Sequence, residues 1–426
     1  MPATRAQTER LLLAYSGGLD TSFLVTWLTR ERGYEVVTLH VDCGGSTATE
    51  RDQLRARSLA LGAVDHIEVD ARAQLFDSVL RWLIAGNVRR GGTYPLCVAA
   101  ERGLQAEQLA RKARELGIGV VAHGCTGAGN DQIRFEAALA IAREEHPGLR
   151  VLAPVRDEAF TREQEVEFLE RHGFPVPASG GRYSVNAGLW GLTIGGGETH
   201  RPAEALPEQA WCWTKDGTGE RVFEVAFERG IPVALDGVAL DPVALIEKLN
   251  VEAGRLGVGR GYHLGDTLLG FKGRIGYEAP AAEILLTAHR ELEKLVLGEE
   301  RRTWKERLGD VYGQRLHQGL LFDPFMRDVE SFLASTQTVV TGTARVRARA
   351  GGVLVEGVSS PYDMMSASED VYGERRAAGA DPAAAVGLAR AWSEPGRLAL
   401  RAKRRAESNR ASVAAEDRAT TPVATH

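Results

Sequence analysis

Residues 11–22 constrain the fold of this chain more than any other segment. They read Leu-Leu-Leu-Ala-Tyr-Ser-Gly-Gly-Leu-Asp-Thr-Ser, so an apolar run ends abruptly in a serine and two glycines. The run predicts a buried parallel strand over Leu11–Tyr15, and the glycines allow a sharp turn close to a ligand. The acid and hydroxyls that follow predict the start of a helix over Phe23–Arg32, whose free N–H groups and dipole favour an anion. The segment therefore predicts a phosphate-binding corner.

The residues of this corner narrow the kind of phosphate that it binds. The corner lacks the Gly-x-x-x-x-Gly-Lys-Ser/Thr of Walker-type loops and the Gly-x-Gly-x-x-Gly of dinucleotide folds. Its form, Ser-Gly-Gly-x-Asp-Thr/Ser-Ser, resembles the pyrophosphate loop of the N-type ATP pyrophosphatases. That resemblance implies cleavage of ATP to AMP and pyrophosphate, with a substrate activated as its adenylate. The alternative is an ordinary strand–turn–helix corner with a capped helix.

Length and charge exclude several classes of protein. The 426 residues are enough for two or three domains. The net charge of −5 gives no global basic field for nucleic acid, and no apolar run is long enough for a membrane span. We therefore expect a cytoplasmic protein that binds neither nucleic acid nor membrane. The four cysteines are scattered, which argues against a zinc site or a disulfide framework: Cys43, Cys97, Cys125 and Cys212.

The first part of the chain alternates between strand and helix patterns, which predicts βαβ units and an α/β fold with a parallel sheet. The predicted strands are Leu11–Tyr15, Glu35–Val41, Asp65–Val69, Ile118–Ala122 and Val151–Pro154. Helices are predicted between and after them, over Thr49–Leu61, Leu75–Asn87, Ala99–Leu116, Asp131–Glu144 and Thr161–His172. Ligands bind at the carboxyl ends of such strands. We therefore expect the Ser16 loop, Asp42–Gly45 and His123-Gly124 to line one rim.

The pattern changes after about Gly173. A long glycine-rich stretch reaches about Gly219 and reads as a loop, and an α+β domain is predicted after it. Its predicted elements are strands Arg221–Glu228, Gln337–Arg349 and Gly352–Val358 and helices Pro242–Arg255 and Ala279–Leu297. A last helix is predicted from Pro382 to about Arg405, with a polar, disordered end. The predicted domains are a nucleotide-binding domain (1–174), a synthetase and oligomerisation domain (175–378) and a helical tail (379–426).

A second motif follows the strand predicted over Ile118–Ala122. Residues 123–136 read His-Gly-Cys-Thr-Gly-Ala-Gly-Asn-Asp-Gln-Ile-Arg-Phe-Glu. The motif places a hydroxyl, an amide, a carboxylate and a guanidinium near one mouth, and Asn130 and Arg134 share a helix face. Asp131 suits an ammonium, and Arg134 suits a carboxylate bound through two N–H groups. The set suits an amino acid, although a capped helix with a solvated first turn is the simpler alternative.

The two motifs together resemble those of the argininosuccinate synthase family. That family carries Ala-x-Ser-Gly-Gly-Leu-Asp-Thr-Ser near its start and His-Gly-x-Thr-x-x-Gly-Asn-Asp-Gln-x-Arg-Phe about a hundred residues later. The resemblance extends from about Leu11 to Tyr277 and more loosely to about residue 375. It implies an adenine nucleotide alpha hydrolase-like domain and a homotetrameric enzyme. It also implies that citrulline is joined to aspartate while ATP is cleaved to AMP and pyrophosphate.

The resemblance also implies roles for individual residues. It assigns ATP to Ala14, Tyr15, Ser16, Gly17, Gly18, Leu19, Asp20, Thr21, Ser22, Val41 and Gly124. It assigns aspartate to Thr126, Asn130 and Asp131, and citrulline to Tyr94, Arg134, Ser184, Thr193 and Tyr277. Three positions depart from the commoner family pattern: Ala128 replaces a lysine, Ala99 a serine and Gly265 a glutamate. Asp266 is our candidate to supply the missing carboxylate. The departures look like a divergent branch of the family.

The expected chemistry needs neutralisation of pyrophosphate and alignment of two substrates. Ser16 and its loop would supply donors to pyrophosphate, and Mg²⁺ is expected because it bridges phosphate oxygens. We expect Asp20 near that ion and Asp131 at the ammonium of aspartate. The residues provide no convincing general base, and the histidines lack the spacing of a resident metal site.

Other interpretations remain open at this level. One is a related ligase that uses a different ureido or amide acceptor, which the changes at Ala99 and Gly265 favour. A tRNA-modifying relative would need a basic face or a cysteine pair, and a glutamine-fed synthetase would need a nucleophilic cysteine. A regulator that binds ATP without catalysis is a fourth, against which Asp20, Asn130 and Arg134 argue.

Overall fold

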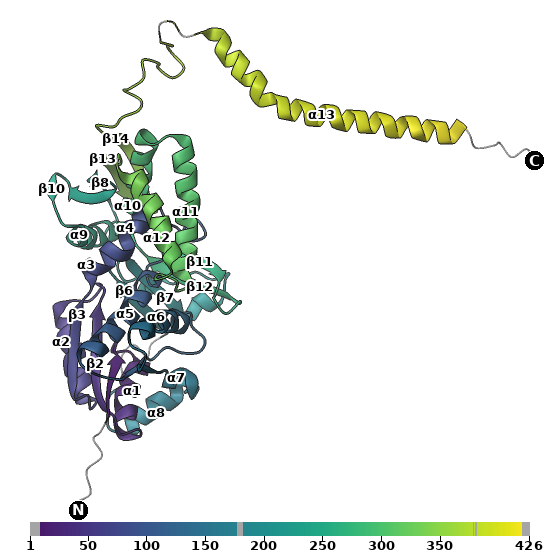
Figure 1. The fold of residues 1–426 in the computed structure, drawn as a ribbon. Helices are drawn as coiled ribbons and strands as arrows, with labels where there is room; N and C mark the ends of the chain where they lie inside the picture. Colours follow the sequence, from purple (N-terminus) through teal and green to yellow (C-terminus); the bar gives the residue numbers. More distant parts are fainter. Residues whose placement is uncertain (1–8, 177–181, 378, 380, 420–426) are drawn as a thin grey trace, which may run out of the picture. The chain divides into compact units, whose positions relative to one another are not determined.

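The computed structural model describes residues 9–176, 182–377, 379 and 381–419. Residues 177–181, within the predicted glycine-rich loop, lie outside the described part. The chain forms two compact units, of which the first ends at Met364 and the second begins at Met365. Figure 1 traces the chain through both units.

The N-terminal sheet of the first unit is parallel and has the strand order β3-β2-β1-β4-β5. Its strands are β1 (Arg10–Ala14), β2 (Glu35–Asp42), β3 (Asp65–Asp70), β4 (Val120–Ala122) and β5 (Arg150–Leu152). Neighbouring residues of β1 enter different hydrophobic clusters, since Leu11 and Leu13 pack on one face of the sheet and Leu12 on the other. Both faces are therefore buried under helices, as the continuous apolar run predicts. The predicted fold class is confirmed.

The helices of this part are α1 (Leu19–Arg30), α2 (Ala48–Ala60), α3 (Arg72–Leu75), α4 (Arg81–Ala85), α5 (Ala99–Glu115), α6 (Asp131–Glu145), α7 (Pro154–Asp157) and α8 (Arg162–Arg171). The single helix predicted over Leu75–Asn87 is wrong in detail, because a π-helical turn at Phe76–Leu80 separates α3 from α4. The last predicted strand also ends earlier, because Pro154 begins α7.

Two antiparallel sheets form the rest of the first unit, with orders β11-β12-β7-β6 and β10-β9-β8-β13-β14. The strands are β6 (Tyr183–Gly188), β7 (Gly191–Gly196), β8 (Glu220–Glu228), β9 (Ile231–Leu235), β10 (Val238–Ala239), β11 (Arg260–Asp266), β12 (Lys272–Glu278), β13 (Gly342–Arg349) and β14 (Gly352–Ser359). The helices are α9 (Pro242–Gly254), α10 (Pro280–Val296), α11 (Glu299–His317) and α12 (Pro324–Gln337).

Several predictions for this region are wrong. The glycine-rich stretch read as a loop contains the β6–β7 hairpin, whose glycines hide the alternation that marks a strand. The helices α11 and α12 were not predicted, because α11 carries charged residues around most of its surface. The strand predicted from Gln337 begins at Gly342, since Gln337 still belongs to α12.

The second unit contains the helix α13 (Pro382–Ala419). It continues well past Arg405, where the sequence predicts a disordered end, because alanine, arginine and glutamate favour a helix even in a polar segment. The remainder of that predicted end, 420–426, lies outside the described residues. No helix in the described part of the chain is both long and apolar enough to cross a membrane.

Candidate active site

A cavity of about 970 Å³ opens at the carboxyl ends of β1, β2 and β4. The two sequence motifs, from β1–α1 and β4–α6, form one side of it, and the β6–β7 hairpin and β11–β12 form another. The cavity is lined by Ala14, Tyr15, Ser16, Gly17, Gly18, Leu19, Asp20, Thr21, Val41, Tyr94, Gly124, Thr126, Asn130, Asp131, Arg134, Ser184, Thr193 and Asp266, among others. Most predicted site residues therefore share one space, with Ser22 and Tyr277 outside its lining.

The Ser16 loop is shaped by its own backbone and hydroxyl groups. Gly17 has φ +74°, in the left-handed region that favours glycine. The hydroxyls of Ser16 and Thr21 lie 3.2 Å apart, and the buried Ser22 hydroxyl donates to the carbonyl of Gly17 at 3.4 Å. Ser22 thus supports the loop from beneath. Helix α1 begins at Leu19 without a side-chain cap, which leaves its first N–H groups to a ligand.

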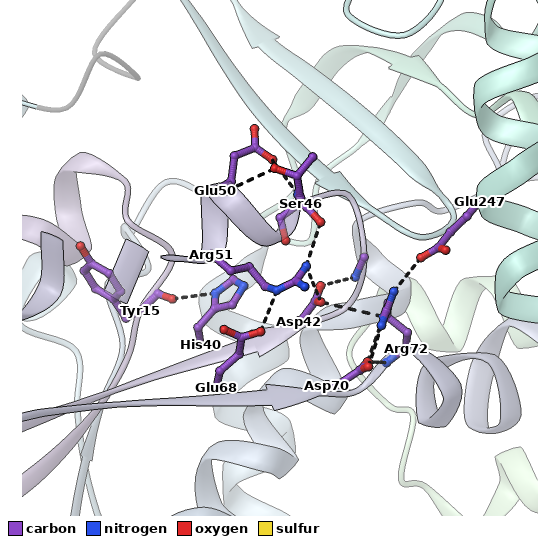
Figure 2. A network of polar contacts seen from close by, with 12 residues as sticks. Tyr15, His40, Asp42, Ser46, Glu50, Arg51, Glu68, Asp70, Arg72 and Glu247 are labelled. Carbon is purple, nitrogen blue, oxygen red and sulfur yellow. Dashed lines mark hydrogen bonds and ion pairs between the residues drawn. The ribbon is translucent and has the colours of Figure 1, made fainter. Parts of the chain in front are cut away.

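A polar network fixes the loop that follows β2 (Figure 2). The buried carboxylate of Asp42 accepts a hydrogen bond from the Gly44 N–H at 2.8 Å. The guanidinium groups of Arg51 and Arg72 lie 3.2 Å and 3.9 Å from the same carboxylate. Two cations and one N–H group therefore hold this corner of the rim in place.

The same network joins the N-terminal sheet to the second part of the unit. Arg72 forms an ion pair with Glu247 of α9 at 2.9 Å, as Figure 2 shows. Nearby, a Cβ at Gly44 would lie 2.9 Å from the backbone of Leu189, and the Leu189 N–H donates to the carbonyl of Cys43 at 2.8 Å. The backbone of the β2 loop is thus in direct contact with the backbone of the β6–β7 hairpin beside the cavity.

The second motif forms an arginine–carboxylate cluster. Asp131 accepts from Arg102 Nε at 2.9 Å and from Arg134 Nη1 at 2.7 Å. Burial acts to raise the pKa of Asp131, but the two guanidinium groups outweigh it and hold that pKa below its usual range. Asp131 is therefore an ionised carboxylate whose charge is already balanced.

Arg134 is engaged with the protein rather than left free for a ligand. Its Nε donates to the carbonyl of His317 at 3.0 Å, and its Nη2 lies 2.9 Å from His317 Nδ1. With the bond to Asp131, all three guanidinium nitrogens have a protein partner. From the sequence, Arg134 was expected to bind a ligand carboxylate through two N–H groups. Its partner His317 was not expected, because that residue ends the unpredicted helix α11.

The β11–β12 connection closes over the start of α6. Asn130 Oδ1 accepts from the Leu268 N–H at 2.8 Å. The Asp266 carboxylate is exposed and pairs with Lys272 at 2.5 Å, while its carbonyl accepts from Arg90 at 2.9 Å. Asp266 lines the cavity, but its carboxylate already pairs with Lys272 and is not free to bind a ligand.

The two predicted tyrosines differ in what they face. Tyr94 lines the cavity, where its buried ring stacks on His263 with centroids 5.2 Å apart. Tyr277 lies behind it, also 5.2 Å away, and its hydroxyl donates to the carbonyl of Thr93 at 3.0 Å. Tyr277 lines a second cavity of about 630 Å³.

Several titratable residues line the main cavity without having been assigned a role from the sequence, among them Glu101, Arg102, Glu165, His263 and His317. Glu165 is buried on α8 and hydrogen-bonded to Asp20. Burial, and then the charge of Asp20, raises the pKa of Glu165 to about 8. Among the described residues, no group of three or more His, Cys, Asp or Glu side chains could by itself hold a metal ion.

Comparisons with known proteins agree with both motifs. The family described as "Arginosuccinate synthase N-terminal HUP domain" matches residues 10–175, and "Arginosuccinate synthase C-terminal domain" matches residues 183–399. The argininosuccinate synthase of Methanocaldococcus jannaschii is 40% identical over 362 residues, which cover 84% of this chain and 90% of the relative.

Two other argininosuccinate synthases are also similar to this chain over most of its length. The argininosuccinate synthase of Symbiobacterium thermophilum is 41% identical over 84% of this chain and 90% of its own. That of Lactiplantibacillus plantarum is 36% identical over 94% of this chain and 97% of its own. The resemblance found in the motifs is thus confirmed along both parts of the chain, which belongs to the argininosuccinate synthase family of C–N ligases.

Proposed function

We propose that this protein joins citrulline to aspartate, with cleavage of ATP to AMP and pyrophosphate through a citrullyl-adenylate. The observation that carries the proposal is the single cavity of about 970 Å³ lined by both the Ser16 loop and the Asn130–Arg134 segment. A phosphate-binding corner and an amino-acid-binding cluster in one space are what this reaction requires.

The reaction proceeds in two displacements. The ureido oxygen of citrulline attacks the α-phosphorus of ATP, and pyrophosphate leaves. The amine of aspartate then attacks the ureido carbon, and AMP leaves with the former ureido oxygen. The protein's contribution is to align the reactants and to stabilise the charge of the leaving groups.

The geometry of the loop supports the ATP assignments that the family resemblance implies. Ser16 and the first N–H groups of α1 would bind the pyrophosphate that leaves, with Val41 and Gly124 beside the nucleotide. Thr126, Asn130 and Asp131 would bind aspartate. Ser184 and Thr193, on neighbouring strands of the hairpin, would bind citrulline together with Tyr94. Tyr277 would support the ring of Tyr94 from behind, and Arg134 would bind the citrulline carboxylate by exchanging one of its protein partners.

The carboxyl groups of Asp20 and Glu165 fit a Mg²⁺ ion. They adjoin one another beside the phosphate corner. Protein-bound Mg²⁺ usually takes one or two carboxylates plus substrate phosphates. The ion would neutralise charge on the polyphosphate of ATP.

Assembly and location complete the proposal. Helix α13 exposes apolar side chains along its length, including Leu388, Trp392 and Leu400. Such a face supports association of copies of the chain, and we propose a homotetramer as in the family resemblance. We place the enzyme in the cytoplasm, where ATP and aspartate are available.

Pyrophosphate release tests the proposed function. Purified protein with ATP and Mg²⁺ should release pyrophosphate in repeated turnovers and form argininosuccinate only when citrulline and aspartate are both present. Release with aspartate and a different acceptor would identify a divergent ligase. Binding of ATP without release under any combination would show a protein that has lost catalysis.

A further inference from the structure

Glu101 is a cavity residue for which the proposed function has no role. It lies in the first turn of α5, lines the main cavity and is only 3% exposed. Its Oε1 is buried and has no hydrogen-bond partner among the described residues. A buried carboxyl oxygen without a partner is costly to the fold, so its presence calls for a functional explanation.

The hairpin leaves space for this carboxyl group. A Cβ at Gly188, the last residue of β6, would lie 1.5 Å from Glu101 Oε1. Any side chain at position 188 would displace the carboxyl group. The position of the Glu101 carboxyl therefore depends on glycine in the hairpin.

The neighbours of Glu101 match its charge only in part. Arg102 Nη1 lies 3.6 Å from Oε2, but that guanidinium also serves Asp131. Asp131 of α6 and Asp42 of β2 are further negative groups around it, and Cys43 and Cys97 are buried thiols nearby. Burial, and then the carboxylates of Asp131 and Asp42, raises the pKa of Glu101 to about 8 despite Arg102.

We propose that Glu101 is the base that receives the α-ammonium of aspartate and removes one proton from it. The inference rests on the proposed function, which requires a free amine as the attacking group. The proton moves from nitrogen to a carboxylate oxygen, so that R–NH₃⁺ and Glu101–COO⁻ become R–NH₂ and Glu101–COOH. The amine lone pair then forms the C–N bond, and AMP leaves.

Position and acidity both support Glu101 over Asp131 in this role. The charge of Asp131 is already matched by Arg102 and Arg134, whereas Oε1 of Glu101 has no hydrogen-bond partner among the described residues. A general base works best when its pKa lies near the operating pH, and a pKa of about 8 places Glu101 in that range. The sequence provided no general base because Glu101 occupies a position outside both motifs.

The test separates activation of citrulline from attack by aspartate. The first step is measured as citrulline-dependent exchange of labelled pyrophosphate into ATP, without aspartate. The variant E101Q should keep this exchange near the wild-type rate, while kcat/KM for aspartate falls by roughly 10²–10⁴-fold. The activity of the wild type should rise toward pH 8, and E101Q should lack this rise.

Two further measurements distinguish proton removal from a structural role. Hydroxylamine is unprotonated at neutral pH, so its capture of the adenylate should be equally fast in wild type and E101Q. The variant G188A should reproduce E101Q by displacing the carboxyl group. The matched control G195A, in open space on β7, should behave as wild type, as should E107Q, which lies on α5 outside the cavity lining.

Three outcomes would overturn the inference. Wild-type ligation by E101Q would show that no proton passes to this residue. Parallel loss of exchange, capture and ligation in E101Q would show a structural role. Absence of citrulline-dependent exchange in the wild-type protein would remove the proposed function and this inference with it.

Discussion

Two carboxyl groups flank the guanidinium of Arg102, and their surroundings hold them in different charge states. Asp131 has two arginine partners and a lowered pKa, whereas Glu101 has one distant partner and a raised pKa. Two carboxyl groups whose pKa values are shifted in opposite directions are typical of active sites, where one stays ionised and the other exchanges protons. The division of roles follows from the number of cations beside each group.

The raised pKa of Glu101 predicts an unusual dependence of stability on pH. The folded protein keeps this proton up to about pH 8, whereas the unfolded chain releases it near 4.5. The folded state therefore binds more protons between these values, and its contribution to stability falls as pH rises. In thermal unfolding, E101Q should gain Tm over the wild type as pH rises through this window. E115Q, at the exposed end of α5, should not show this gain, and the same gain in E115Q would contradict the assignment.

Gly17 is the glycine on which the phosphate corner most depends. Alanine there would combine φ +74° with a Cβ placed 2.1 Å from Leu54 Cδ2, so the loop has to move. We expect G17A to raise KM for ATP at least about tenfold, since strain of about 1–3 kcal/mol is typical of such positions. Gly33 has a similar φ of +70° in open space outside the cavity. G33A should lose stability but keep its KM, and an equal KM change in both would refute the role of the loop.

At the scale of elements, the site is made where the two parts of the first unit meet. The β2 loop contacts the hairpin through Cys43 and Leu189, and α9 holds Leu189 through Asn250 Nδ2 at 2.9 Å. The connections are backbone contacts and buried polar bonds. A rim fixed in this way keeps the phosphate corner and the hairpin hydroxyls at a constant separation, which alignment of two substrates requires.

The buried His66, where β2, β3 and α2 meet, predicts that the enzyme loses stability in acid. His66 of β3 is buried, with Nδ1 2.8 Å from Thr38 Oγ1 and 3.2 Å from Ser58 Oγ. Burial lowers the pKa of His66 to about 4, so between about pH 6.5 and 4 only the unfolded chain binds this proton. Stability should fall as pH decreases through this range. H66Q should flatten that part of the curve in denaturant titrations, and an unchanged slope would show that another group is responsible.

At the scale of the whole molecule, the sequence predicted the parts with strong periodicity and failed where packing decides. The parallel sheet and both ligand loops followed from apolar runs ending in glycine. The β6–β7 hairpin did not, because its glycines carry no side chains to alternate. Arg134 was found, but its partner His317 lies 183 residues away on a helix whose charged surface hides its buried face. A contact between residues so far apart in the sequence cannot be derived from the local pattern of apolar and polar residues.

Helix α13 should control assembly. Removal of residues 382–426 would take away the exposed apolar side chains of this helix while leaving the first unit intact. We expect the truncated protein to form smaller assemblies by light scattering and to keep ATP binding. The point substitution W392K, at a side chain that is 77% exposed, should act in the same direction. Full-size assemblies in both variants would contradict a role for this face.

In the proposed reaction, one cavity activates citrulline at its ureido oxygen before aspartate attacks. The most direct test uses citrulline labelled with oxygen-18 in the ureido group, followed by mass spectrometry of the products. The label should appear in AMP and be absent from pyrophosphate and from argininosuccinate. Unlabelled AMP formed together with argininosuccinate would show that the ureido oxygen never bonds to phosphorus, and would rule out a citrullyl-adenylate.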